Sequence, residues 1–237
     1  MKQTTFAGTR PPELAGRDEL RERVKVAIQR ARIGRPAKSV IMVGLRGVGK
    51  AALLKQMFMD ADAADIRSIF IEAPEKRSML AILAPQLRMS LLCLSGVEAA
   101  RDSAVRGLKA LAGFAKGLKV RSCDIELGID YDPEPGLADN GDLESDLATL
   151  LTEIGITVRS AGTALVLFID ELQHVDEEEL AALITALLRV SQLGLPVMLV
   201  GAGLPQLRGR AGNVRSYAER LFDYPEIGPS TNSKGGS

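Results

Sequence analysis

The sequence predicts an α/β fold, a three-layer sandwich in which helices cover both faces of a five-stranded parallel sheet. Five short, mostly apolar runs alternate with longer stretches in which apolar residues recur at helical spacing. The run over 39–43 is apolar at nearly every position, which is typical of a strand buried on both faces. The 46% apolar content excludes wholesale disorder, and the 4% aromatic content predicts an aliphatic core. At 237 residues the chain is long enough for one domain with a small appendage.

The first half of the chain is expected to hold two strands and four helices. The opening residues carry Pro11-Pro12 and predict an extended or loop segment to about Ala15. Apolar spacing and Gly/Pro breaks then predict, in order, a helix over 18–32, a strand over 39–43, a helix over 50–61, a strand over 66–71, and helices over 77–95 and 97–118.

The second half begins with an expected insertion over 119–141. Residues 119–131 alternate apolar and polar side chains and predict a hairpin turning at Gly128, and residues 132–141 form an acidic loop rich in Pro and Gly. The remaining pattern predicts a helix over 142–159, a strand over 164–171, a helix over 176–192, a strand over 196–201, a helix over 214–221 and a strand over 222–227. We expect a core over 1–228 and a disordered tail or cloning remnant over 229–237.

Several functional classes are excluded by composition. The apolar runs are far shorter than the roughly 18 residues of a membrane span, and no signal peptide is visible, so we expect no membrane association and a cytoplasmic protein. Cys93 and Cys123 do not form a disulfide framework and are expected in the core and in a strand, respectively. Because His174 is the only histidine, zinc chemistry and a Ser-His-Asp triad are not expected.

Zero net charge hides an asymmetry between the ends of the chain. Residues 1–60 hold 13 basic and five acidic side chains, whereas the remainder is acidic by the same margin. A basic N-terminal quarter can attract the phosphates of a nucleotide or of a nucleic acid. The plainer interpretation, which we favour, is a solvated helix face together with one phosphate site.

The strongest motif lies between the first strand and the second helix. Residues Gly44-Leu45-Arg46-Gly47-Val48-Gly49-Lys50-Ala51 fit the pattern G-x-x-x-x-G-K in the required strand–turn–helix context. Glycines let backbone N–H groups turn towards an anion, and the helix N-terminus adds partial positive charge. We therefore predict that residues 44–52, including Ala52, bind a nucleotide, with Lys50 at its β- and γ-phosphates.

Ala51 departs from this pattern. The residue after the lysine is ordinarily Ser or Thr, whose hydroxyl binds Mg²⁺, and alanine has no oxygen to offer. We expect phosphate binding to survive and metal placement, and with it hydrolysis, to weaken.

The second motif is the apolar run 164–169, which ends in Asp170-Glu171. A strand of this kind delivers two carboxylates to its carboxyl end, beside the phosphate loop. Asp170 is the predicted Mg²⁺ ligand and Glu171 the predicted general base for an attacking water. A plain helix start would explain the two acids alone, but not their pairing with the loop upstream.

Together the motifs resemble those of AAA+ ATPases, in particular the origin-recognition (Orc-type) branch, over about residues 12–228. The resemblance implies the strand order 5-1-4-3-2, with residues 44–51 and 170–171 as Walker A and Walker B motifs. Leu14–Leu20 resembles the short sequence motif, or box, that precedes the first helix in this family. The resemblance implies that the backbone of Gly16 and Arg17 contacts the adenine. The chain ends near Ile227, where the family places a helical lid, so we expect the core alone.

Two further positions follow from the resemblance. The family usually has an Asn or Thr at the end of the fourth strand that senses the γ-phosphate, and this chain has neither there. Gln206 is therefore the candidate for contacting the γ-phosphate. The alternative is that Gln206 belongs to a turn that simply starts a helix. Ser216–Phe222 resembles the segment that ends in an arginine finger, which would carry Arg220 into a neighbouring subunit's site. The alternative is an ordinary salt bridge of Arg220.

The expected function is ATP binding with Mg²⁺-dependent hydrolysis by Lys50, Asp170 and Glu171, driving a conformational switch. The alternatives are a nucleotide-binding regulatory module with little turnover, because of Ala51, and a DNA-associated helper ATPase. Expected partners are ATP and ADP, further copies of the chain through Arg220, and a DNA or protein client.

Overall fold

The structure, a computed structural model, describes residues 12–121, 131–214 and 218–228. Its centre is a five-stranded parallel sheet in the order β2-β3-β4-β1-β5, which confirms the predicted fold class and strand order. The strands are β1 (Ser39–Val43), β2 (Arg67–Glu72), β3 (Leu165–Asp170), β4 (Val197–Gly203) and β5 (Phe222–Asp223). The sequence bounds of four strands agree with these to within about two residues, and β5 is shorter than expected.

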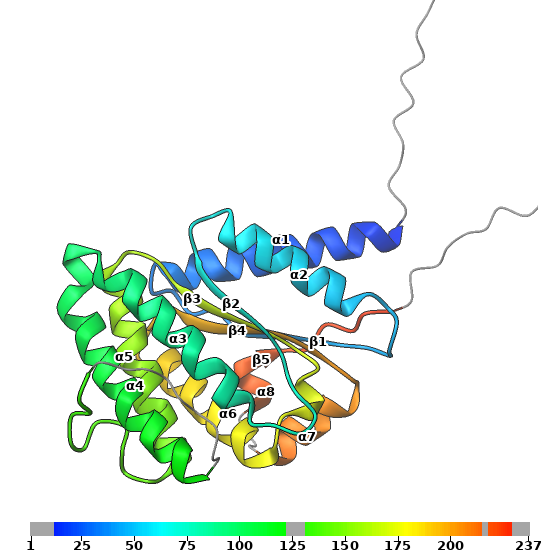
Figure 1. Cartoon of the computed structure of the whole chain (residues 1–237). Coiled ribbons are helices and arrows are strands. Elements are labelled where there is room, and N and C mark those ends of the chain that lie inside the picture. Colours follow the sequence, from blue (N-terminus) through cyan, green and yellow to red (C-terminus); the bar gives the residue numbers. More distant parts are fainter. Residues whose placement is uncertain (1–11, 122–130, 215–217, 229–237) are drawn as a thin grey trace, which may run out of the picture.

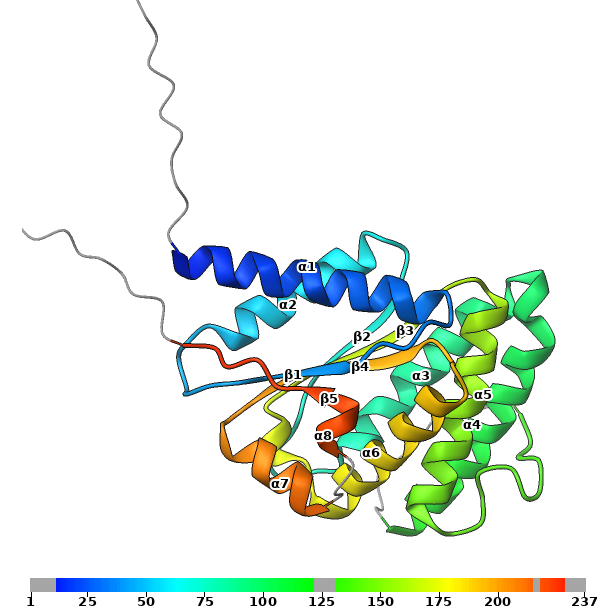
Figure 2. The same cartoon turned by 180° about the vertical axis from the view of Figure 1, so that it is seen from behind.

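Helices cover both faces of this sheet (Figures 1 and 2). One face carries α1 (Pro12–Arg32) and α2 (Lys50–Asp62). The other carries α3 (Met79–Ser95), α5 (Leu143–Ser160) and α6 (Glu177–Gln192), with α4 (Arg101–Arg121) packed outside α3 and α5. The remaining helical segments are η1 (Glu98–Ala100), η2 (Leu172–His174), α7 (Gln206–Val214) and α8 (Ala218–Leu221).

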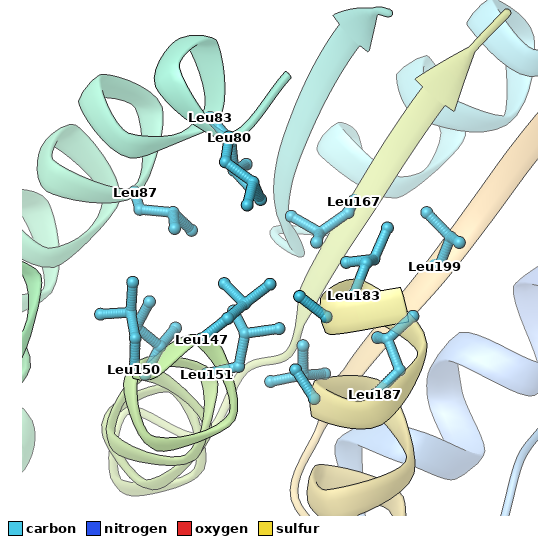
Figure 3. Packing of buried hydrophobic residues seen from close by; sticks show 14 of the residues in the cluster. Leu80, Leu83, Leu87, Leu147, Leu150, Leu151, Leu167, Leu183, Leu187 and Leu199 are labelled. Carbon is cyan, nitrogen blue, oxygen red and sulfur yellow. The ribbon is translucent and has the colours of Figure 1, made fainter. Parts of the chain in front are cut away.

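The core divides into two clusters, one on each side of the sheet. The larger is almost entirely aliphatic, as the composition predicts, and its leucines interdigitate between α3, α5, α6 and the sheet (Figure 3). The smaller lies under α1 and α2, where Phe58 and Phe168 make an edge-to-face contact with ring centroids 5.6 Å apart. The central strands are buried on both faces, so their pairing register is strongly specified. The residues that follow their carboxyl ends are therefore brought together at one edge of the sheet.

Three sequence predictions about local structure are wrong. The segment before Ala15 is helical, because Pro12 occupies the first position of α1, where a proline loses no hydrogen bond. The helix expected over 214–221 is given too late a start, because α7 already begins at Gln206; Gly209 and Gly212 lower its helix propensity and hide it in the sequence. Residues 215–217 lie outside the described residues. Cys93 is exposed on α3 and does not lie in the core.

The predicted hairpin is corrected at its start. Helix α4 continues through Arg121, so residues 119–121 are helical and not extended. Residues 122–130 and Cys123 lie outside the described residues. The loop that follows packs on α4, where a Cβ at Gly113 would lie 2.6 Å from the carbonyl oxygen of Leu137. In the described part of the chain, no helix is long and apolar enough to cross a membrane.

A buried carboxylate joins α6 to the start of α3. Glu179 is 8% exposed and accepts hydrogen bonds from the Ser78 hydroxyl and from the Met79 backbone N–H, the latter at 2.9 Å. It thereby satisfies donors at a helix N-terminus that would otherwise be buried without partners.

We expect Glu179→Ala to lower the free energy of unfolding by about 2 kcal/mol, because it strands these buried donors. Chemical denaturation measures this loss, with Glu177→Ala, exposed in the first turn of the same helix, as the matched control. Equal stability of the two variants would contradict the capping role.

The same carboxylate should make stability depend on pH. Burial raises the pKa of Glu179, against the opposing effect of hydrogen bonds from Ser78, Met79 and Leu80. The native chain therefore takes up this proton at a higher pH than the unfolded chain. The resulting stabilisation is fully present below the unfolded pKa and is lost as pH rises through the raised one. As the pH rises from the unfolded pKa to the raised native pKa, the free energy of unfolding of the parent chain should fall relative to that of Glu179→Gln.

Candidate functional site

The loop between β1 and α2 has the conformation that the glycine pattern predicts. Gly47 and Gly49 adopt left-handed backbone angles, with φ of 78° and 84°. Gly49 is the N-cap of α2 and supplies no side-chain cap, and the first turn of α2 carries no acidic residue. The positive end of the helix is therefore neither capped nor neutralised by side chains, which suits it to bind an anion.

Lys50, the first residue of α2, folds back over this loop. Its side chain is 9% exposed, and Nζ donates hydrogen bonds to the carbonyl oxygens of Gly44 at 2.9 Å and of Leu45 at 2.8 Å. A lysine is seldom this buried without a carboxylate partner. Its charge is thus held at the mouth of the loop by backbone dipoles, ready to act on a phosphate.

Arg17 reaches the same loop from α1. Its Nη2 donates to the carbonyl oxygen of Val48 at 2.7 Å, and its Nη1 lies 3.1 Å from where a Cβ on Gly49 would be. Gly16 and Arg17 lie inside α1, so the expectation that their box precedes the first helix is wrong. The structure brings the Arg17 guanidinium against the loop as a second cation.

The other loop residues present an open face. Leu45, Arg46, Ala51 and Ala52 are exposed, whereas Val48 packs into the core under α1 and α2. Ala51 turns only a methyl group outwards. The structure therefore supplies no side-chain oxygen at the position that follows Lys50.

Asp170 ends β3 at the same edge of the sheet. Its side chain is 7% exposed, and Oδ1 accepts a hydrogen bond from the Glu171 backbone N–H at 2.8 Å. Burial raises the pKa of Asp170, the neighbouring carboxylates Glu171 and Glu72 raise it further, and Lys50 acts in the opposite direction. Because β1 and β3 both pair in parallel with β4, the loop that follows β1 and this carboxylate lie at the same edge of the sheet.

Glu171 has an unusual backbone. Its φ is 53°, in the left-handed region that few non-glycine residues adopt. This turn ends β3 and starts η2. The carboxylate accepts a hydrogen bond from the Gln173 side-chain amide.

The two positions that depend on the family resemblance lie farther along the chain. Gln206 is exposed at the first position of α7. The polar side chain that meets the end of β4 is instead Gln173, whose Oε1 accepts from the Leu204 N–H at 3.1 Å. Arg220 is exposed on α8, and among the side chains that the structure describes it has no ion-pair partner.

Sequence reasoning missed the contribution of Arg210. Its guanidinium donates to the backbone carbonyls of Gln173 at 2.7 Å and Val175 at 2.6 Å, and so ties α7 to η2. No pattern in the sequence signals this contact, because its acceptors are backbone oxygens more than 30 positions away.

The basic excess of the N-terminal quarter is partly neutralised in the fold. Arg21 forms a two-pronged hydrogen-bonded pair with Asp60 on α2, and Arg23 pairs with Asp223 on β5. These pairs agree with a solvated helix face rather than a free basic stripe on α1.

An open cavity of about 620 Å³ lies between α1 and the start of β1, lined mainly by apolar groups. None of its lining residues belongs to the loop 44–50 or to residues 170–173. The chemistry-bearing residues lie at the opposite, carboxyl end of the strands, which is where ligands of such sheets bind. We therefore place the functional site at the loop and not in this cavity.

Comparison with known proteins agrees with this architecture. The Orc1 protein of Aeropyrum pernix, solved in complex with DNA, superposes with a TM-score of 0.51 at 14% identity, covering 94% of this chain and 47% of that one. Cdc6p of Pyrobaculum aerophilum gives a TM-score of 0.52 at 14% identity, covering 96% and 48%. This chain thus spans about half the length of those proteins and shares the fold of their Orc-type AAA+ core.

A comparison with curated protein sequences finds no match. One protein family, described as AAA ATPase domain, matches residues 13–200. That span contains the loop, Lys50 and the Asp170-Glu171 pair. The chain therefore belongs to the AAA ATPase domain family.

Proposed function

We propose that the chain binds ATP at the loop 44–50 and hydrolyses it with Mg²⁺, using the turnover to drive a conformational switch. The observation that carries the proposal is that Lys50 and Asp170, 120 positions apart in the sequence, lie at the same edge of the sheet, because β1 and β3 both pair in parallel with β4. A phosphate-binding cation and a pair of carboxylates at one edge of the sheet are the parts that phosphoryl transfer to water requires.

Binding relies on the backbone and on two cations. The uncapped N–H groups at the start of α2 hold the phosphates, and Lys50 contacts the β- and γ-phosphates. Arg17 supports the loop through Val48, and Gly16, one residue earlier on α1, is the proposed neighbour of the adenine. Gln206 at the start of α7 is the proposed contact of the γ-phosphate.

In the proposed reaction, a water attacks the γ-phosphorus and transfers its proton to the Glu171 carboxylate. The bond from the γ-phosphorus to the β–γ bridging oxygen breaks, and ADP leaves with that oxygen. Arg220 from a neighbouring copy of the chain offsets the charge on the transferring phosphoryl group. The exposed position of Arg220 on α8 supports this role in trans.

The donor set at the loop fits Mg²⁺ when the nucleotide supplies most of the ligands. Magnesium in nucleotide sites ordinarily takes one or two carboxylates plus phosphate oxygens and water. Asp170 is the carboxylate that would hold it, and the ion would neutralise charge on the phosphates. Among the described residues no group of three or more His, Cys, Asp or Glu side chains gathers into a preformed metal site.

The proposal is tested by titrating ATP and measuring steady-state hydrolysis on the same sample, with Mg²⁺ and with EDTA. We expect saturable binding and turnover that EDTA abolishes. Binding without any turnover would favour the second candidate, and the absence of binding would overturn both.

The second candidate is a nucleotide-binding regulatory module with little hydrolysis, and Ala51 is the observation that favours it. Restoring a hydroxyl with Ala51→Thr should raise Mg²⁺-dependent hydrolysis by roughly tenfold, since the added oxygen can bind the ion. Because Ala51 is exposed, the change needs no repacking.

Ala63→Thr, the same change at the exposed far end of α2, is the matched control for Ala51→Thr and should leave the rate unchanged. An Ala51→Thr rate equal to that of the parent chain would show that the missing hydroxyl does not limit turnover.

A nucleic-acid client is the least supported part of the function. The Aeropyrum pernix relative was solved with DNA, but Arg21 and Arg23 of α1 are held in ion pairs here. We propose oligomerisation through Arg220 ahead of DNA binding. Retention of labelled duplex DNA at low salt, lost at modestly higher salt, would support a DNA-associated role.

A further inference from the structure

We propose that Gln173 is a positioning residue for Glu171. It bridges the Glu171 carboxylate to the backbone at the end of β4 and so sets the direction in which that carboxylate meets the attacking water. The inference rests on the proposed function, in which Glu171 is the general base. It adds a residue whose role neither its type nor its place in the sequence indicates.

Both ends of the Gln173 amide are engaged. Nε2 donates to Oε2 of Glu171, and Oε1 accepts from the Leu204 N–H at 3.1 Å. A carboxylate can only accept and a backbone N–H can only donate, so these partners fix which end of the amide is which. The side chain of Glu171 is thereby tied to the strand next to its own.

The fold leaves room for this bridge. A Cβ at Gly203 would lie 3.0 Å from Oε1 of Gln173, so a larger residue at the end of β4 would crowd the amide. Arg210 holds the backbone of this turn through the carbonyl oxygens of Gln173 and Val175. Arg210 therefore holds the backbone of Gln173, and the Leu204 N–H holds the end of its side chain.

The bridge constrains one oxygen of the base and leaves the other available. Oε2 of Glu171 is taken by Gln173, and no hydrogen bond joins Oε1 to another residue of the described part of the chain. A glutamate side chain has three rotatable bonds, and without a second anchor it samples many orientations. Misplacement of a catalytic group by as little as 1 Å can cost roughly 100-fold in rate, so losing the anchor should be visible in kcat.

Two substitutions at Gln173 distinguish its hydrogen bond to Glu171 from its hydrogen bond to Leu204. Gln173→Glu keeps an acceptor for the Leu204 N–H but loses the donor to Glu171. Gln173→Met, of similar length, loses both bonds. We expect each to lower kcat by about tenfold while KM and the ATP dissociation constant stay within about twofold. Gln192→Glu, the same chemical change at an exposed site on α6, should leave all three unchanged.

A double substitution tests whether Gln173 acts through Glu171. In a Glu171→Gln background, Gln173→Met should cause no further loss, because the group that it positions is already disabled. The same fall in both backgrounds, or a rise in KM with kcat unchanged, would overturn the inference. If both Gln173 variants hydrolyse ATP at the parental rate while Glu171→Gln is slow, the positioning role of Gln173 is overturned and the proposed function stands. No turnover in the parent chain, or a parental rate in Glu171→Gln, would overturn both.

Discussion

Replacing Lys50 by alanine should weaken ATP binding by roughly 100-fold, because a charge-assisted contact to phosphate contributes up to about 3 kcal/mol. Hydrolysis should fall below detection, since the same ammonium offsets charge on the transferring phosphoryl group. Arg17 does not replace it, because its guanidinium is engaged with the Val48 carbonyl. Titration with a fluorescent ATP analogue and a phosphate-release assay measure the two effects.

Lys55→Ala is the matched control, since Lys55 is exposed on the same helix. It should bind and hydrolyse ATP like the parent chain. A thermal melt without nucleotide should check that Lys50→Ala remains folded, because it removes two hydrogen bonds to the loop. A folded Lys50→Ala variant with parental ATP affinity would refute the assignment of the loop as the phosphate site.

Replacing Glu171 by glutamine should lower kcat by about 10²- to 10⁴-fold, the range that a general base contributes. Glutamine has nearly the shape of glutamate but cannot accept the proton of the attacking water. ATP affinity should stay close to that of the parent chain, because the phosphates are held by the loop and Lys50. Single-turnover hydrolysis, with nucleotide binding measured separately, resolves the two.

Glu177→Gln makes the same chemical change at an exposed position in the first turn of α6 and should not alter turnover. Parental turnover in Glu171→Gln would require a different base. A loss of binding equal to the loss of turnover would instead assign Glu171 to nucleotide binding.

The parallel sheet was predictable because its three central strands, β1, β3 and β4, are buried on both faces. Such a strand has to be apolar at almost every position, so runs such as 39–43 and 164–169 stand out from their surroundings. The strand order required the family resemblance, since alternation of strands and helices allows several orders. The observed order β2-β3-β4-β1-β5 agrees with it.

The helices at the two ends of the described chain were harder to predict. Pro11-Pro12 indicates a loop by composition, yet a proline at the first helical position is favourable. Gly209 and Gly212 obscure α7, which is stabilised by packing and by Arg210 rather than by propensity. In both cases tertiary context decides what local sequence leaves open.

Parts of the candidate site were predictable for a different reason. Lys50 follows the glycine-rich turn after β1, Asp170 and Glu171 lie at the end of β3, and the carboxyl ends of parallel strands meet at one edge. The contacts of Arg17 with Val48, of Gln173 with Leu204 and of Arg210 with Gln173 were not predictable, since each joins two segments that are distant in the sequence. A contact between a side chain and a distant backbone carbonyl leaves no periodic trace in the sequence.

The close approach of Gly44 and Ile227 has a mechanical consequence. The Ile227 N–H donates to the Val43 carbonyl at 2.7 Å, and a Cβ at Gly44 would lie 2.4 Å from the Ile227 carbonyl oxygen. The backbone at 227 is therefore fastened to β1 where the phosphate loop begins. A mechanical force applied to the chain at residue 227 would act on the phosphate loop before it acts on the rest of the sheet. Nucleotide bound in the loop would resist that force, so tension and phosphate binding act on the same few atoms.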